Sequence, residues 1–117
     1  MKNILKDKSY AFAIRVVNLY KYLVKEKREF VISKQILRSG TSIGALIREA
    51  EFAQSKVDFI NKMSIALKEA NETNYWIDIL SETKFINYKM YESLKFDSEE
   101  VLKILVSTVK TSKSNIK

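Results

Sequence analysis

The 117-residue chain has no proline and only two glycines, and both glycines lie in one run of small residues between Arg38 and Ala45. The apolar residues around this run keep a helical spacing, which places Gly40 and Gly44 inside a helix and on its apolar face. Glycine within a helix costs about 1 kcal/mol relative to alanine. The pair therefore predicts that another helix packs closely against the backbone at Gly40 and Gly44.

So few turn-forming residues, together with an apolar period near 3.6, predict an all-helical chain. Three long helices are expected, from about Lys8 to Arg28, from Ser33 to about Gln54, and from Lys56 to Thr83. Ser33 is a candidate N-cap of the second helix. Ser55 and Asp58 have the spacing of a capping box at the start of the third.

The last third of the chain is less regular. A short helical turn is expected over Tyr88 to Leu94, and Asp97 or Ser98 is expected to cap a fourth helix with Val101, Leu105 and Val109 on its inner face. A polar tail is expected from about residue 111. Four amphipathic helices with short connections predict one domain over residues 1–117, an antiparallel up-down-up-down four-helix bundle.

The composition excludes several kinds of chemistry. The chain has no cysteine and no histidine, so disulfides, thiol catalysis, histidine triads and the usual zinc sites are excluded. Neither glycine belongs to a phosphate-binding loop. No catalytic residue, metal site or cofactor is predicted. The one enzymatic alternative is a carboxylate metal site between the second and third helices, formed by Glu49, Glu51, Glu69 and Glu72.

The charge favours an anionic partner. Lysine and arginine number 21 against 14 acidic residues, a formal net charge of +7, and residues 1–30 hold eight basic and three acidic side chains. Such an excess favours nucleic acid, RNA or DNA, bound mostly by electrostatic attraction. The candidate contacts lie on the first two helices: Lys21, Lys25, Arg28, Lys34, Arg38 and Arg48. The plain alternative for these side chains is a solvated helix face.

Several residues lie off the main apolar stripes. On the third helix they form a second line, Ile65, Glu69, Glu72 and Trp76, beside Ile79, and Ile14 is similarly misplaced on the first helix. In a monomer these residues would not face the core. The line of four, together with Ile79 and Ile14, is therefore the candidate interface of a homo-oligomer. Core filling and membrane adsorption are the alternatives, and the acidic residues in the line oppose binding to anionic lipid.

No stretch approaches the length of apolar chain that spans a bilayer, and the N-terminus lacks the apolar segment of a signal peptide. We therefore expect a cytoplasmic protein with no membrane partner.

The second and third helices contain a series of short motifs: QILRSGTSIGA from Gln35, REAE from Arg48, AQSK from Ala53, DFI from Asp58 and SIALKEA from Ser64, followed by Glu72-Thr73 and Tyr75-Trp76. In order and spacing they closely resemble the bacterial 23S rRNA intervening-sequence protein family, also called four-helix-bundle proteins. The match covers about 45 residues. Leu46 departs from it, because relatives often have asparagine there.

The resemblance implies a gene inside an intervening sequence of a large-subunit ribosomal RNA gene, a four-helix bundle and a homopentameric ring. It also implies kinship with the accessory protein of diversity-generating retroelements, a basic bundle associated with nucleic acid and a reverse transcriptase. It implies no enzyme activity. Two functions from different classes follow: a homopentamer that binds RNA through basic helix faces, or an adaptor that binds a protein partner.

Overall fold

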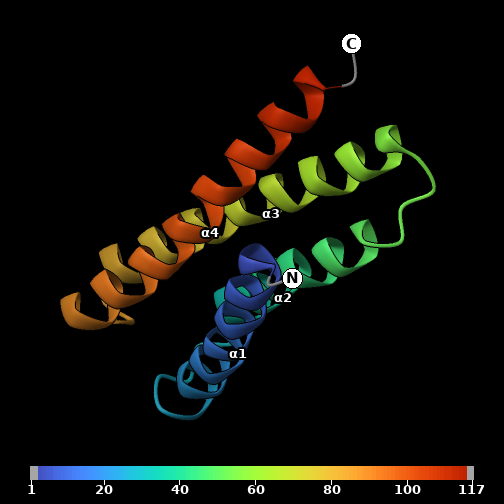
Figure 1. Ribbon diagram of the computed structural model, residues 1–117. Coiled ribbons are helices and arrows are strands. Elements are labelled where there is room, and N and C mark those ends of the chain that lie inside the picture. Colours follow the sequence, from blue (N-terminus) through green and yellow to red (C-terminus); the bar gives the residue numbers. More distant parts are fainter. Residues whose placement is uncertain (1–2, 116–117) are drawn as a thin grey trace.

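A computed structural model describes residues 3–115 (Figure 1), and this part of the chain contains four helices and no strand. Their bounds are α1 Ile4–Lys25, α2 Ile32–Ala50, α3 Lys56–Glu82 and α4 Tyr88–Ser114. None of these helices has a stretch long and apolar enough to cross a bilayer.

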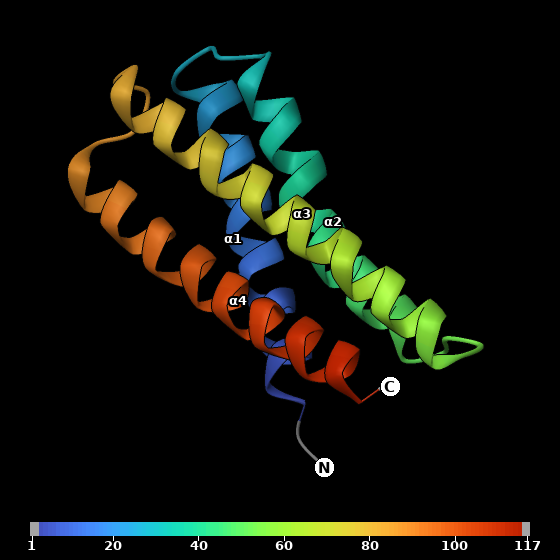
Figure 2. The same ribbon diagram turned by 90° about the horizontal axis from the view of Figure 1, so that it is seen from above.

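Consecutive helices are antiparallel and form two hairpins, α1 with α2 and α3 with α4, which face each other (Figures 1 and 2). The molecule is elongated, with extents of 48 × 25 × 20 Å. Helix α2 packs against α1 and α3, α3 packs against α4, and α1 touches α4 least. The predicted up-down-up-down four-helix bundle is confirmed. Because α1 and α3 are diagonal, their outer faces point to different sides of the molecule.

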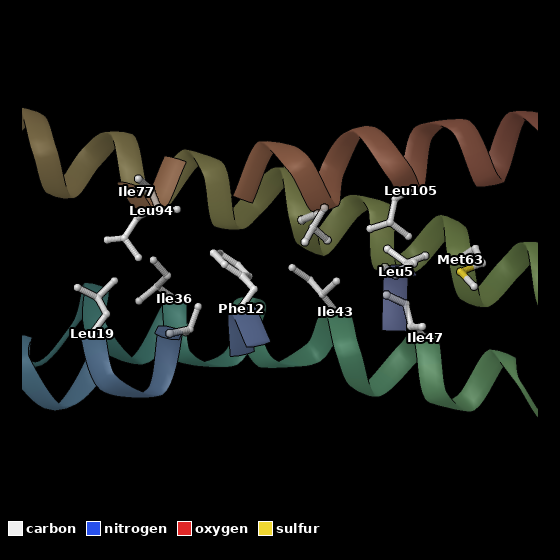
Figure 3. Close-up of a cluster of buried hydrophobic side chains, with 14 of the residues drawn as sticks. Leu5, Phe12, Leu19, Ile36, Ile43, Ile47, Met63, Ile77, Leu94 and Leu105 are labelled. Atoms are coloured by element: carbon white, nitrogen blue, oxygen red, sulfur yellow. The ribbon is translucent and has the colours of Figure 1, made fainter. Parts of the chain in front are cut away.

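The core lies between the two hairpins (Figure 3) and is built from the predicted apolar stripes. Residues that are almost fully buried come from every helix: Phe12, Val16, Leu23, Ile36, Ile43, Ile47, Ala66, Ala70, Ile77, Leu80, Val101 and Leu105. Within each helix these residues recur mostly every three, four or seven residues, the spacing of one face of a helix.

Gly40 brings α2 close to α1. A β-carbon on Gly40 would lie 2.7 Å from Cγ2 of Val16, whereas one on Gly44 would lie 3.5 Å from the nearest atoms of Ser9. The first distance is a steric clash and the second is ordinary contact. The two helices therefore approach too closely for a side chain at Gly40, while Gly44 has room for a methyl group.

Buried polar side chains link neighbouring helices. Thr73 of α3 donates to Oγ of Ser39 on α2 at 2.9 Å, and Ser98 of α4 donates to Oδ1 of Asn74 on α3 at 2.7 Å. All four residues are buried. Because an unpaired buried hydroxyl or amide is costly, a shift of one helix along the next would break these bonds. They fix the register of α2, α3 and α4.

Several predicted boundaries were wrong. Helix α1 begins at Ile4 rather than Lys8, and the Asn3 side chain caps it by accepting from the Lys6 N–H at 3.0 Å. Helix α4 begins at Tyr88, capped by Asn87, and continues through residues 97 and 98. It continues to Ser114, so the described part of the tail expected from residue 111 is largely helical.

Two predicted N-caps differ in outcome. The capping box of α3 is confirmed in part: Ser55 Oγ accepts from the Asp58 N–H at 3.0 Å, while the Asp58 carboxylate accepts from Gln54 rather than from Ser55. Ser33 is not the cap of α2, because the helix begins at Ile32 and Ser33 is buried in its first turn.

Candidate functional site

The turn between α1 and α2 is fixed by one buried carboxylate. Glu29 accepts three backbone N–H groups at the start of α2, from Val31 at 3.1 Å, Ile32 at 2.9 Å and Ser33 at 2.7 Å. The Ser33 hydroxyl donates back to the Glu29 carbonyl at 2.9 Å, and the Glu29 N–H donates to the Leu23 carbonyl at 3.0 Å. These bonds satisfy the N–H groups that a helix start leaves without partners.

Burial raises the pKa of the Glu29 carboxyl, but the N–H groups of Ile32, Ser33 and Val31 outweigh burial and hold that pKa below its ordinary value. The side chain is therefore a carboxylate at neutral pH. Its negative charge lies at the N-terminus of α2, where the helix dipole favours it.

Five exposed cations surround this turn. Lys21 and Lys25 lie one turn apart at the end of α1, Lys27 and Arg28 lie in the connection, and Lys34 lies in the first turn of α2. We call these five residues the basic turn. Lys27 was not predicted, although its sequence position between Lys25 and Arg28 would have supported it. Residues 21–34 hold these five cations and two acids, Glu26 and Glu29, a net charge of +3.

None of the five cations forms an ion pair within residues 3–115. Two of them lie near aromatic rings instead: the Lys27 ammonium is 5.9 Å from the ring centroid of Tyr22, and the Arg28 guanidinium is 5.8 Å from that of Phe30. Arg28 has φ 55°, a left-handed backbone conformation that favours glycine. The basic turn is thus a cluster of cations without carboxylate partners.

Arg38, also predicted as a nucleic-acid contact, is held by two carboxylates of α3. Its guanidinium donates to Glu69 at 2.6 Å and to Glu72. Glu69 and Glu72 raise the pKa of Arg38, and bonds from Trp76 Nε1 and Arg38 lower the pKa of Glu72. This arrangement neutralises the charge of Arg38, so we leave it out of the basic turn.

Arg48 is separated from the other predicted contacts. It lies 14 residues after Lys34 on α2, about 21 Å along a helix axis, and its guanidinium is 5.2 Å from the ring centroid of Tyr10. The six predicted residues are therefore not one patch. The fold brings together Lys21, Lys25, Arg28 and Lys34. Arg38 lies one helical turn after Lys34 but is paired with carboxylates of α3, and Arg48 lies apart from the others.

The six predicted interface residues lie on two sides of the bundle. Ile14 is on α1 and is 48% exposed, whereas Ile65 is on α3 and is 38% exposed. Trp76 and Ile79 of α3 are half-buried, and Trp76 packs partly against the core. Glu69 and Glu72 pair with Arg38 of the same chain. The apolar residues Ile14 and Ile65 therefore remain as two separate exposed positions on diagonal helices.

The carboxylate site considered from the sequence does not form. Glu49 pairs with Lys62 at 3.3 Å, Glu51 with Lys6 at 2.9 Å, and Glu69 and Glu72 with Arg38. No group of three or more acidic side chains that could hold a metal ion occurs in the part of the chain that the structure describes. Each of these glutamates already pairs with a cation of the protein, Glu69 and Glu72 with the same one.

Comparison with known proteins agrees with the fold and the motifs. The family described as "23S rRNA-intervening sequence protein" matches residues 1–107. A solved crystal structure of a protein with unknown function from the S23 ribosomal protein family of Bacteroides thetaiotaomicron VPI-5482 is 64% identical, with a TM-score of 0.90, over 92% of this chain and 99% of that one. Curated proteins gave no match. The chain therefore belongs to the 23S rRNA-intervening sequence protein family.

Proposed function

We propose that this protein is a non-enzymatic, cytoplasmic homo-oligomer that binds nucleic acid, RNA in particular, through the basic turn. The observation that supports this most is the local density of unpaired cations. Elsewhere in residues 3–115, exposed cations that form no ion pair, such as Lys68, Lys103 and Lys110, are spread along α3 and α4. Other cations pair across helices, as Lys8 does with Glu100 and Arg15 with Asp97. The basic turn has five exposed cations and no such pair within residues 3–115. Cations without carboxylate partners are the groups that exchange counterions for phosphates.

The backbone of Arg28 gives a second argument. A left-handed conformation costs an L-residue about 1–2 kcal/mol, and glycine would adopt it without that cost. The chain nevertheless has arginine at this position, with φ 55°. Strained residues gather at functional positions. The other left-handed residue within residues 3–115, Lys84 with φ 69°, lies outside the basic turn. At Arg28 the strain coincides with four neighbouring cations that form no ion pair in the same part of the chain, which supports a role for its charge.

The oligomer is part of the same proposal. Exposed apolar residues on two diagonal helices, Ile14 on α1 and Ile65 on α3, suit a head-to-tail ring in which one face of each subunit meets the other face of the next. We propose a pentamer because the sequence resembles pentameric bundles. Five copies of a +7 chain would carry about +35, a strong long-range attraction for RNA.

The test is RNA binding by two triple variants across a salt series. In the first, Lys21, Lys25 and Arg28 are replaced by glutamine; in the matched control, the exposed cations Lys103, Lys110 and Lys113 of α4 are replaced instead. Both lose three charges. We expect a weaker affinity and a smaller salt slope for the first variant, by about 0.7 for each lost contact with single-stranded RNA, and a much smaller change for the control.

Equal losses in the two variants would refute a specific role for the basic turn, and unchanged binding in both would refute an electrostatic mode. An adaptor that binds a protein partner is the rival function. It predicts that the wild-type protein binds RNA no better than either variant does.

A further inference from the structure

We propose that the basic turn takes unpaired nucleotides, with the Phe30 ring as the surface on which a base stacks and Val31 as its apolar neighbour. This inference rests on the proposed function and names the class of RNA. Phe30 is 48% exposed and Val31 is 72% exposed. Both lie inside the basic turn, between Arg28 and Lys34.

The arrangement combines the two elements of single-strand recognition. Such sites pair cations that follow the phosphates with aromatic rings on which bases stack. Here the Arg28 guanidinium lies 5.8 Å from the Phe30 ring centroid. A base placed on the exposed part of that ring would keep its own phosphate within reach of Arg28, Lys27 or Lys34.

The backbone that carries the ring is also anchored before any ligand arrives. Phe30 directly follows Glu29, whose carboxylate accepts three N–H groups and whose own N–H donates to the Leu23 carbonyl at 3.0 Å. Its backbone is therefore fixed between two anchored positions. An anchored backbone leaves only the side chain to be ordered when a base binds, which lowers the entropy lost on binding.

Duplex RNA does not use such a surface. In a duplex the bases are already stacked and paired, so Phe30 could meet only the sugars and phosphates, and binding would depend on charge alone. A lipid surface fits less well than unpaired RNA, because two exposed apolar side chains bury little area compared with the apolar face of a membrane-binding helix.

The experiment compares three ligands of equal length by fluorescence anisotropy at one salt concentration: a 12-nucleotide oligouridine, its abasic analogue, and a 12-base-pair RNA duplex. The abasic strand keeps the phosphates and removes the bases. We expect the wild-type protein to bind oligouridine about 5- to 150-fold more tightly than the abasic strand, the range for one stacked base.

Substitutions at Phe30 separate stacking from apolar contact. Phe30→Ala and Phe30→Leu should both lose most of the preference for bases, since leucine is apolar but has no aromatic face, whereas Phe30→Tyr should keep it. Abasic and duplex binding should change less than twofold in all three. The control is Phe52→Ala, which removes an aromatic side chain that is 85% exposed at the opposite end of the bundle.

Equal affinity of the wild-type protein for oligouridine and the abasic strand would overturn the inference and leave the proposed function standing. If Phe30→Leu kept the full preference for oligouridine over the abasic strand, base stacking on the ring would be overturned. Loss of binding to anionic phosphatidylglycerol vesicles in Phe30→Ala, with RNA binding intact, would assign the turn to a membrane instead. A protein that binds none of the three RNA ligands would refute the proposed function itself.

Discussion

A β-carbon on Gly40 would lie 2.7 Å from Cγ2 of Val16, a fully buried side chain on the facing helix. Valine is branched at Cβ and has little rotamer freedom in a helix, so it cannot move aside cheaply. We therefore expect Gly40→Ala to lower the free energy of unfolding by about 1–2 kcal/mol, because overpacking outweighs the better helix propensity of alanine. Urea unfolding followed by circular dichroism at a fixed protein concentration measures this change in the free energy of unfolding.

Gly44→Ala is the matched control, one helical turn away. The added methyl group would meet Ser9 at 3.5 Å, which is ordinary contact, so the helix propensity of alanine is expected to raise the stability by up to about 1 kcal/mol. Equal destabilisation by the two substitutions would contradict this account of the helix crossing.

The glycines illustrate how far the sequence alone could lead. Their spacing identified the helix and the face that packs closely, because both follow from a local period. It could not distinguish Gly40 from Gly44, because the clash depends on which α1 side chain lies opposite. That side chain is the β-branched Val16 at Gly40, and Ser9 at Gly44.

The boundary errors have the same cause. Asp97 and Ser98 look like a helix start, since both are favoured N-caps. In the structure Asp97 pairs with Arg15 of α1 at 2.7 Å, and Ser98 bonds Asn74 of α3. Their polar groups are thus satisfied by distant helices, and α4 passes through them without a break. Sequence spacing carries no sign of such contacts.

For the candidate site, the sequence identified four of the five cations of the basic turn. It could not show that Arg38 is engaged by α3, nor that the Glu29 carboxylate caps α2 by accepting N–H groups two to four residues later. The first depends on how α2 packs against α3, and the second on the geometry of the turn between α1 and α2.

The engagement of Arg38 leads to a prediction. Because Glu69 and Glu72 hold its guanidinium, Arg38→Gln should change RNA affinity less than Lys25→Gln does in the same anisotropy assay. It should lower the free energy of unfolding by up to about 1 kcal/mol, since the Arg38 side chain is half exposed and solvent screens the pairs. A larger loss of affinity than in Lys25→Gln would place Arg38 in the RNA interface.

The Glu29 cap should make part of the stability depend on pH. Because the folded-state pKa of Glu29 lies below its ordinary value, the carboxylate stabilises the fold fully above its unfolded pKa, about 4.3. That contribution is lost as pH falls through the lower folded-state pKa. Glu29→Gln should therefore cost about 1–3 kcal/mol at pH 7.

The cost of Glu29→Gln should shrink as the pH is lowered from about 5. Urea unfolding of both proteins across that range gives the difference, and Glu82→Gln, an exposed acid at the end of α3, is the control. A cost that does not vary with pH would mean that the charge of Glu29 contributes nothing.

The head-to-tail arrangement makes a specific prediction about mixtures. Ile14→Asp should disable the α1 face and Ile65→Asp the α3 face, and each variant alone should be a monomer with unchanged helicity, since both side chains are exposed. A mixture of the two retains one intact pair of faces. We therefore expect a heterodimer, measured as a doubled mass by light scattering. A mixture that stays monomeric would contradict the two-face ring.

The left-handed position of Arg28 allows stability and binding to be separated in one substitution. With φ 55°, the residue occupies a conformation that glycine adopts without strain. Arg28→Gly should therefore leave the stability unchanged or raise it by up to about 1 kcal/mol, after the larger entropy of glycine in the unfolded chain is counted, and should weaken RNA binding.

Lys84, with φ 69° in the turn between α3 and α4, gives the matched control: Lys84→Gly should give a similar gain in stability with a smaller loss of affinity. If Arg28→Gly instead unfolded the protein, the arginine would serve the fold, and the retention of a cation at a strained position would no longer support RNA binding.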